Sequence, residues 1–402
     1  MTSEEATSEK VAESWLTAMQ NLVAVGSPLT KRLFDRLVVR EEFTASQRTR
    51  LERLRPWVSK IEANPKAPVV APGEVPFGII GYKSADFQQA SRNIGDWVQT
   101  IAMSSHVLRR PNVILTGDRD LVDSFTRMRE QVPAAKEIDG PSGVMRLVEV
   151  NRDASRYDAI PENTWTFVFG WFMKRPFEGP SPFPLNPNIL PIFLSFHISR
   201  PDMLTPSAIE YLKDHGPVGC RDWYTVQVLS DAGVPAFFSG CVTTTVGGLF
   251  PDAPSDRWKK RAVIDVPASG DEEDVVRLTN LDNKLRNVGL ASGLDKAFAR
   301  LERYRTEFSE IETSRLYTYL PAQSLGVPTA WLPGDPNDRR FKGLVGPTAE
   351  PYDVMVGRIP GLIKTVVDAV LSGDDIEAVY SAYRQAAKEE VANSATRLRD
   401  QQ

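Results

Sequence analysis

Cysteine is almost absent from this chain of 402 residues, which contains only Cys220 and Cys241. Two cysteines cannot supply the disulfide framework of a small secreted domain. Each of them directly follows a glycine at the end of a predicted strand, so we expect both thiols to be buried, unpaired and structural. Such cysteine usage is typical of a cytoplasmic protein.

Long apolar stretches and an excess of one charge are missing as well. No run approaches the ~20 apolar residues that cross a bilayer, and the acidic start MTSEEATSEK lacks the apolar region of a signal peptide. The formal net charge of −4 gives no overall basic character that would favour a nucleic-acid partner. We therefore expect a cytoplasmic protein without a transmembrane segment, while peripheral membrane association and homo-oligomerisation stay open.

Motifs with a fixed chemistry are also absent. The sequence has no P-loop, no GxSxG, no CxxC and no HExxH, and it shows no internal repeat. These absences count against the nucleotide hydrolases, serine hydrolases and zinc enzymes that carry such motifs, and we expect no metal and no cofactor. With 42% hydrophobic and 25% charged residues, the chain has an ordinary globular composition and is long enough for two domains.

Residues 217–246 contain the clearest strand–helix–strand unit of the sequence. A short strand ends at Cys220, Asp222 is a good helix N-cap, and Gly233 ends the helix before a second strand. Arg221 lies where the first strand ends and the helix begins. Because a helix N-terminus offers unpaired N–H groups and a partial positive charge, this arginine indicates an anion site. A surface arginine beside a helix cap is equally compatible with the spacing.

A similar arrangement follows at residues 310–332. Thr313 or Ser314 is expected to cap a helix with Arg315 in its first turn, and Pro321 predicts a kink in that helix. The sequence therefore places two arginines at two helix starts in one αβ layer. Such a pair predicts a ligand with two anionic ends.

Residues 93–96, Asn-Ile-Gly-Asp, open another helix after the predicted strand at 77–82. Asn93 can cap this helix, and Gly95 would let a ligand approach the backbone closely. The alternative is an ordinary capped loop between a strand and a helix.

The three histidines differ in their predicted positions. His197 ends the strand at 189–196, which is the edge where α/β folds place chemistry, and a structural histidine is the alternative. His106 and His215 lie in predicted helices, and we expect both to be exposed and without a special role.

The periodicity as a whole predicts an α/β chain with helical ends. Apolar residues recur at helical spacing from residue 8 to 61, beginning with the stripe Val11, Trp15, Met19 and Leu22. The predicted strands are 77–82, 113–115, 144–150, 164–169, 189–196, 218–220, 234–238, 262–266 and 327–332. We divide the chain into a helical segment at 1–72, a first lobe at 76–213, a second lobe at 214–350 and closing helices at 351–402.

Seven short motifs, taken together, resemble the polysaccharide pyruvyltransferase family over residues 81–344. They are NIGDWVQ at 93–99, GWF at 170–172, SFHI at 195–198, GCRDWYT at 219–225, SGCVTTT at 239–245, SRLY at 314–317 and RFKGL at 340–344. No single motif decides the assignment, which rests on their number, order and spacing.

The resemblance implies two Rossmann-like lobes that face a cleft, as in GT-B glycosyltransferases. It implies phosphoenolpyruvate as donor and a sugar with two hydroxyls as acceptor, whether nucleotide-linked, lipid-linked or part of an oligosaccharide. The product is a pyruvate ketal in cell-surface polysaccharide biosynthesis. By motif position Arg221 and Arg315 bind the donor. Asp222, Ser314 and Leu316, which flank these arginines, are expected to contact the substrate as well, and Asn93, Gly95 and Asp96 are expected to meet the acceptor.

Tyr317 departs from the family pattern, which has histidine after the Arg-Leu pair. Tyrosine has a reference pKa of ~10, so it can donate a hydrogen bond at neutral pH but is a poor general base. Three outcomes are open: Tyr317 suffices as a donor, the proton role falls to His197, Asp222 or Asp96, or activity is lost. The competing functions are a GT-B glycosyltransferase that uses a nucleotide sugar and a catalytically silent phosphoenolpyruvate-binding protein.

Overall fold

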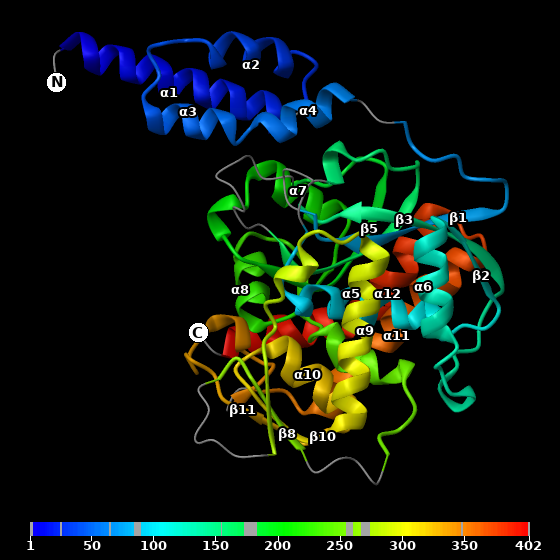
Figure 1. The fold of residues 1–402 in the computed structure, drawn as a ribbon. Coiled ribbons are helices and arrows are strands. Elements are labelled where there is room, and N and C mark those ends of the chain that lie inside the picture. Colours follow the sequence, from blue (N-terminus) through cyan, green and yellow to red (C-terminus); the bar gives the residue numbers. More distant parts are fainter. Residues whose placement is uncertain are drawn as a thin grey trace.

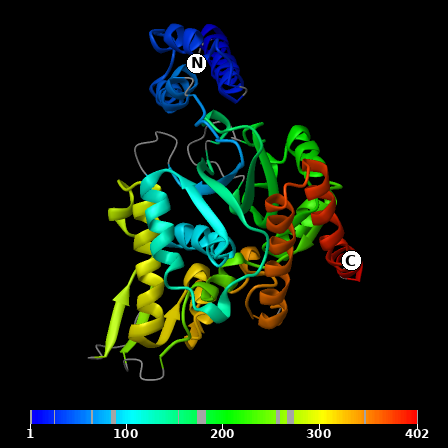
Figure 2. The ribbon, with the colours of Figure 1, turned by 90° about the vertical axis from the view of Figure 1, so that its right-hand side faces the viewer.

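The computed structural model describes residues 3–24, 26–63, 66–83, 90–153, 155–172, 183–254, 260–266, 274–346 and 349–400. These segments form two parallel β-sheets with helices packed around them, and a group of N-terminal helices is set apart from the sheets (Figures 1 and 2). The predicted α/β class is confirmed. In the described part of the chain, no helix combines the length and the apolar character that crossing a bilayer requires.

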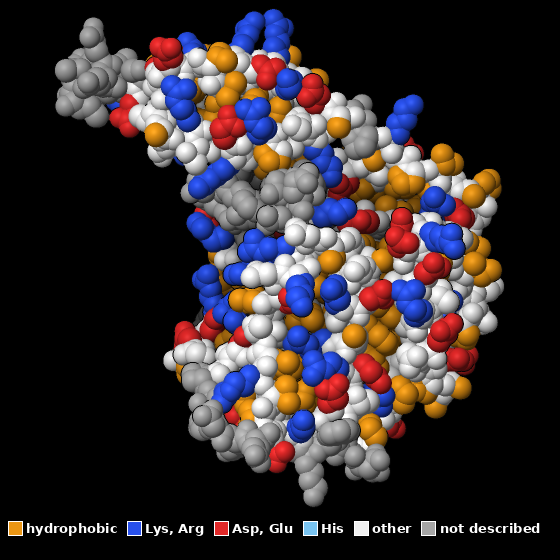
Figure 3. All heavy atoms as spheres, viewed as in Figure 1, with side chains coloured by type: hydrophobic (Ala, Val, Ile, Leu, Met, Phe, Trp, Pro, Cys, Tyr) orange, Lys and Arg blue, Asp and Glu red, His pale blue; other side chains and the backbone are white. Residues whose placement is uncertain are grey.

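The N-terminal unit consists of α1 (Ser3–Ala24), α2 (Thr30–Val38), α3 (Ala45–Glu52) and α4 (Arg55–Ala63). It has a small hydrophobic core of its own, to which α1 contributes Ala12, Leu16, Met19 and Val23. The helices were predicted, and Met19 of the predicted stripe lies in the core, but the other three stripe positions are each displaced by one residue, to Ala12, Leu16 and Val23. Val11 and Trp15 are 49% and 38% exposed, because the small side chain of Ala12 and not the larger Val11 faces the neighbouring helices. Figure 3 shows charged side chains of both signs on the outside of this unit.

One tyrosine joins the N-terminal unit to the rest of the molecule. Tyr157 belongs to the small N-terminal core, and its hydroxyl donates to the carbonyl of Val23 at 2.5 Å. Its ring meets the edge of Trp57 with the ring centroids 5.4 Å apart, and Lys60 forms an ion pair with Asp158. The N-terminal unit therefore packs on the turn η2 (Ser155–Tyr157).

The larger sheet has seven strands in the order β2-β3-β1-β4-β5-β6-β7. They are β1 (Glu74–Gly81), β2 (Val113–Gly117), β3 (Gly143–Asn151), β4 (Thr164–Phe172), β5 (Ile189–Ile198), β6 (Val218–Cys220) and β7 (Ala236–Phe238). The connecting helices are α5 (Ile94–Leu108), α6 (Arg119–Arg129), α7 (Pro206–Asp214) and α8 (Trp223–Asp231). All described pairings are parallel, and the chain changes direction across the sheet beside β1, which is where doubly wound sheets bind ligands.

The larger sheet continues past the boundary that the sequence placed between residues 213 and 214. In register, Phe196 of β5 pairs with Cys220 of β6, and Cys220 pairs with Phe238 of β7. The unit at 217–246 is therefore the edge of the first sheet and not the start of the second. The sequence pattern of a strand shows that it is buried but not which sheet it joins, because pairing is set by tertiary contacts. Both Cys220 and Cys241 are unpaired and fully buried, as predicted.

The smaller sheet has four strands in the order β11-β10-β8-β9. They are β8 (Lys260–Ile264), β9 (Val275–Leu278), β10 (Phe308–Thr313) and β11 (Thr329–Trp331), with α9 (Leu290–Glu307) and α10 (Leu316–Ser324) between them. Pro321 lies inside α10, as predicted. The strands β9 and β10 were not predicted. Short 3₁₀ helices complete the chain: η1 (Ala134–Lys136), η3 (Pro201–Met203), η4 (Val242–Leu249), η5 (Asn283–Leu285) and η6 (Arg339–Phe341).

The closing helices α11 (Tyr352–Leu371) and α12 (Ile376–Asp400) return to the larger sheet. From α12, Tyr380 donates to the carbonyl of Pro191 at 3.2 Å, and Tyr383 donates to that of Phe193 at 2.8 Å. Both carbonyls belong to β5, and the N–H of Phe238 in β7 donates to the hydroxyl of Ser394 in α12 at 3.1 Å, so α12 covers the first sheet from β5 to its β7 edge. The predicted helical end of the chain is confirmed.

Candidate functional site

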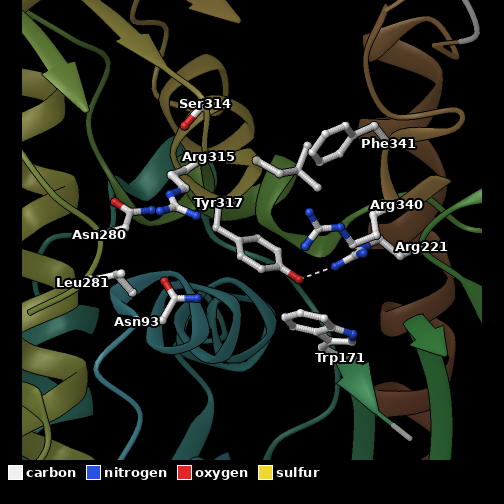
Figure 4. Close-up of a pocket in the computed structure, with 11 residues that line it drawn as sticks. Asn93, Trp171, Arg221, Asn280, Leu281, Ser314, Arg315, Tyr317, Arg340 and Phe341 are labelled. Atoms are coloured by element: carbon white, nitrogen blue, oxygen red, sulfur yellow. Dashed lines mark hydrogen bonds between the residues drawn. The ribbon is translucent and has the colours of Figure 1, made fainter. Parts of the chain in front are cut away.

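A small pocket lies at the carboxyl ends of strands from both sheets (Figure 4). Trp171 lies near the end of β4, Arg221 directly follows β6, and Ser314 directly follows β10. The lining residues are Asn93, Trp171, Arg221, Asn280, Leu281, Ser314, Arg315, Leu316, Tyr317, Arg340 and Phe341, around a cavity of about 130 Å³. Pockets for drug-sized ligands typically measure ~300–1,000 Å³, so this one suits a compact ligand.

Two predicted helix caps lie beside this pocket. The side chain of Asn93 accepts from the backbone N–H of Gly95 at 3.1 Å at the start of α5. Asp222 accepts from the N–H of Thr225 at 3.0 Å at the start of α8. Both caps are confirmed, but only Asn93 lines the pocket, whereas Asp222 is fully buried behind it. The partial positive charge of these helix starts favours an anion in the pocket.

The start of α10 differs from its prediction. The N-cap is Arg315 itself, and neither Thr313 nor Ser314 caps the helix. The hydroxyl of Thr313 instead accepts from the N–H of Arg315 at 3.0 Å, and the hydroxyl of Ser314 donates to the carbonyl of Asp265 at 2.7 Å. The reason is the unpredicted strand β10, whose backbone stays extended through Thr313.

Arg221 and Arg315 face each other across the pocket from different sheets, and not from one αβ layer as expected (Figure 4). Their environments differ. Arg221 is only 3% exposed, and its Nη1 donates to the hydroxyl of Tyr317. Its Nη2 lies 3.4 Å from the carboxylate of Asp222, and its Nε has no hydrogen-bond partner among the described residues. Such a buried guanidinium is held rigidly at the pocket wall.

Arg315 has a side chain that is 46% exposed, and it forms one ion pair behind the pocket. Its Nε lies 2.8 Å from Oδ2 of Asp265, and the same oxygen accepts from the N–H of Asn280 at 3.0 Å. Burial opposes the charge of Asp265, but hydrogen bonds from Thr279, Asn280 and Arg315 bring the pKa of this carboxyl below its usual value. The aspartate is therefore a stable anchor for the arginine.

Tyr317 lies between the two arginines as a neutral hydrogen-bond donor. Burial raises the pKa of Tyr317 well above its ordinary value, although the charge of Arg221 acts in the opposite direction. Because the hydroxyl oxygen accepts from Arg221, its own proton can be donated to a ligand.

Gly95 makes room for Tyr317, and not for a ligand as expected. A Cβ atom at residue 95 would lie 2.6 Å from the Cβ of Tyr317, which is closer than such atoms approach in proteins. Gly95 does not line the pocket. The glycine therefore acts indirectly, because it lets the N-terminus of α5 pack against α10.

His197 is 1% exposed and lies behind the pocket wall rather than in it. Its Nδ1 is 2.6 Å from Oδ2 of Asp222, and its ring centroid is 6.2 Å from that of the lining residue Trp171. Burial first, and then the charges of Arg221 and Arg340, lower the pKa of His197, while Asp222 opposes them. The imidazole is therefore neutral at neutral pH. With its proton on the Nδ1 that faces Asp222, Nε2 is left as a base.

Asp96 belongs to a separate ion cluster and does not line the pocket. Its Oδ1 lies 3.6 Å from the buried Arg152, which also binds Asp153, and its Oδ2 accepts from Ser91 at 2.6 Å. The Arg152 guanidinium lies 4.8 Å from the centre of the Tyr82 ring. Asp96 therefore stabilises the first turn of α5 and does not contact a ligand in the pocket.

The other two histidines lie away from the pocket, and the expectation that His106 is exposed was wrong. His106 is 1% exposed, and its Nε2 lies 3.0 Å from the hydroxyl of Thr245 in η4. The reason is that α5 is buried along its whole length. His215 is half-buried, with Nδ1 2.9 Å from the carbonyl of Tyr211.

Five lining residues were not proposed as site residues from the sequence: Trp171, Asn280, Leu281, Arg340 and Phe341. Trp171, Arg340 and Phe341 lie within the GWF and RFKGL motifs, so the signal for them was present. Asn280 and Leu281 follow the unpredicted strand β9 and carried no signal. They matter for the assembly of the site, since the N–H of Ile94 donates to the carbonyl of Asn280 at 2.9 Å and links the two sheets.

Comparisons of the chain with protein-family models, with curated proteins and with solved structures find no match. In the described segments, no group of three or more His, Cys, Asp and Glu side chains is arranged to hold a metal ion. The chemistry of the pocket is therefore the main ground for a functional assignment. That chemistry consists of three arginines, two amides, two hydroxyls and three aromatic rings around a small volume, with Tyr317 supplying both a ring and a hydroxyl.

Proposed function

We propose that the pocket binds phosphoenolpyruvate and that the protein transfers its pyruvyl group to two hydroxyls of a sugar. The product is a pyruvate ketal, and the acceptor belongs to cell-surface polysaccharide biosynthesis. The observation that carries the proposal is the approach of Arg221 and Arg315 to one small pocket from two sheets. Phosphoenolpyruvate is compact and has one phosphate and one carboxylate, and guanidinium groups bind both in bidentate fashion.

The seven motifs that resemble the polysaccharide pyruvyltransferases support the same reaction, and six of the ten residues proposed from them line the pocket. The carboxyl edges of both sheets meet at this site, which is compatible with a GT-B-like pair of lobes. We include that arrangement in the proposal.

The first chemical step adds a sugar hydroxyl to phosphoenolpyruvate. The step adds the O–H of the sugar across the C2–C3 double bond: the hydroxyl oxygen forms a bond to C2, and the proton that the hydroxyl loses is balanced by the proton that C3 gains. Because His197 is buried behind the pocket wall, its Nε2 would relay this proton only through a water in the pocket, and Asp222, 2.6 Å from Nδ1, would stabilise the imidazolium during the relay. The arginines and the Tyr317 hydroxyl stabilise charge on the phosphate and carboxylate.

The second step closes the ketal. The oxygen of the second hydroxyl forms a bond to C2, and the bond between C2 and the phosphate oxygen breaks. Phosphate leaves with the proton of that hydroxyl, so that one donor and one sugar yield one ketal and one phosphate. The same cationic groups stabilise the charge on the leaving phosphate.

A catalytically silent phosphoenolpyruvate-binding protein is the second candidate, and one observation favours it. The position that is histidine in the family is Tyr317, whose hydroxyl is bonded to Arg221 and stays protonated. A nucleotide-sugar glycosyltransferase is less well supported, because a nucleotide sugar is large for a cavity of about 130 Å³.

Calorimetry and a phosphate-release assay separate these functions. We expect phosphoenolpyruvate to bind, and phosphate to be released only when a suitable sugar acceptor is present. Binding without release for every nucleotide-linked, lipid-linked and oligosaccharide acceptor would support the silent binder. Binding of a nucleotide sugar in place of phosphoenolpyruvate would contradict the proposal.

A further inference from the structure

A third arginine reaches the pocket on the segment that leads from β11 back to the first sheet. This segment is fixed beside α8, because the carbonyl of Lys342 accepts from the N–H of Trp223 at 3.1 Å. Gly343 has a φ of +89°, and a Cβ atom there would lie 2.5 Å from the Trp223 side chain. Only glycine allows both this conformation and this close approach. The turn therefore presents Arg340 to the pocket in a defined position.

Arg340 has a single carboxylate partner within the described chain, and that pair is partly open to solvent. Its Nε donates to Oδ2 of Asp338 at 2.7 Å, and its side chain is 42% exposed. The guanidinium lies 5.6 Å from the centre of the Trp171 ring. Solvent-exposed ion pairs contribute little to stability, so a ligand anion can replace Asp338 as the partner of Arg340.

Arg221 and Arg340 enter the pocket from one side, and Arg315 enters from the opposite side (Figure 4). The two arginines on one side also act on the same buried group, since both lower the pKa of His197. A phosphate carries up to two charges and several acceptor oxygens, whereas a carboxylate carries one charge and two oxygens. Two guanidinium groups on one side and one on the other match this asymmetry.

We propose that Arg221 and Arg340 together form the phosphate subsite, that Arg315 forms the carboxylate subsite, and that phosphate displaces Asp338 from Arg340. The assignment deepens the proposed function and rests on it. It makes Arg340 a specificity-determining residue that distinguishes phosphoenolpyruvate from simple 2-oxo acids.

Calorimetric titration of the full-length protein with inorganic phosphate, phosphoenolpyruvate and pyruvate tests this assignment. We expect Arg340→Ala to weaken phosphate and phosphoenolpyruvate binding about tenfold or more, and to leave pyruvate binding unchanged. Asp338→Asn keeps an oxygen that can cap η6 but removes the competing charge, so it should strengthen phosphate binding severalfold. Arg339→Ala is the matched control, because Arg339 stacks over Tyr224 and does not line the pocket.

His197 provides a second readout that a change in overall charge alone would not give. The charged groups that act on its ring are Arg221, Asp222, Arg340 and Asp338. A phosphate between the two arginines should raise the pKa of His197, as measured by NMR titration of its ring signals. In Arg340→Ala the pKa of the unliganded protein should already be higher, and the rise on phosphate binding should be smaller.

The outcomes separate this inference from the proposed function. If wild type binds phosphoenolpyruvate and Arg340→Ala binds phosphate equally well, the subsite assignment is wrong and the proposed function stands. If Arg340→Ala and Arg339→Ala lose phosphate affinity equally, the loss comes from the change in overall charge and not from a contact of Arg340. This result would also overturn the subsite assignment. No gain in Asp338→Asn would remove Asp338 as the displaced partner. Wild type that binds neither phosphate nor phosphoenolpyruvate would overturn both proposals.

Discussion

At the scale of single residues, the two arginines on opposite sides of the pocket differ most in burial. Arg315→Ala removes an exposed side chain, so we expect weaker phosphoenolpyruvate binding with little change in the melting temperature. Arg221→Ala leaves the buried Tyr317 hydroxyl without its partner and removes one of several partners of Asp222, which keeps His197 and Thr225. It should therefore also lower the free energy of unfolding, by ~1–3 kcal/mol.

Lysine variants and two measurements complete this test. Lysine at either position should restore binding only in part, because it offers a point charge in place of a planar fork. Calorimetry gives the affinity and thermal unfolding gives the stability. Unchanged affinity in both alanine variants would contradict the anion site.

Turnover measurements on variants can distinguish the catalytic role of Tyr317 from that of His197. Tyr317→Phe removes a neutral donor next to Arg221 and should lower turnover about 10²–10³-fold while phosphoenolpyruvate still binds. If His197 carries the proton instead, His197→Gln is the more damaging change and Tyr317→Phe is mild. Tyr317→His should preserve or raise turnover in the first case. Loss of donor binding in Tyr317→Phe would show that the tyrosine has a structural role that neither idea includes.

At the scale of elements, the sequence predicted the helix caps, which depend on neighbouring residues. It missed two strands, which depend on pairing with a strand that is distant in the sequence. Asn93 and Asp222 were identified as caps because a cap and the N–H that it binds are two or three residues apart. The strands β9 and β10 carry few alternating apolar residues of their own, with only Phe308, Ile311 and Thr313 fully buried in the two together. They are strands because they pair with β8, a contact that no local pattern reveals.

Asp222 caps helix α8, and its charge also acts on His197. Two substitutions separate these roles. Asp222→Asn keeps an oxygen that can cap α8 but removes the charge beside His197 and Arg221. Because Asp222 holds the pKa of His197 up against burial and the arginines, we expect this pKa to fall further and turnover to drop, with α8 intact.

Asp222→Ala removes the cap as well, so it should lower the free energy of unfolding by ~1 kcal/mol more than Asp222→Asn. NMR titration of His197, turnover and chemical denaturation measure the three effects. Equal stability of the two variants would show that the cap adds nothing beyond the charge.

At the scale of the whole molecule, the site exists only where the two sheets meet. The sequence motifs named residues on both sides, but Asn280 and Leu281 were not proposed because their position depends on how the sheets are joined. The two sheets contact each other directly at the pocket, because Asn93 before α5 and Leu281 after β9 form an antiparallel β-bridge. Ligand affinity and the packing of the two sheets are therefore coupled through the start of α5.

The same helix α5 makes the whole molecule sensitive to acid through His106. Burial, with a contribution from Arg109 and Arg110, lowers the pKa of His106 to about 3, whereas its ordinary value is 6.5. Between these values the unfolded chain binds a proton that the folded protein does not. The stability is therefore fully present above pH 6.5 and falls as the pH drops toward 3, by up to ~1.4 kcal/mol per pH unit.

His106→Gln isolates this effect from the carboxylates that also titrate in acid. Glutamine can still hydrogen-bond the hydroxyl of Thr245 but does not titrate, so the variant should lose stability less steeply than wild type between pH 6.5 and 4. Above pH 7 it should be no more stable than wild type, because the buried packing of α5 is disturbed. Urea denaturation at several pH values gives both slopes. Parallel slopes for the two proteins would mean that His106 is protonated in the folded state, or that α5 opens before the rest of the molecule unfolds.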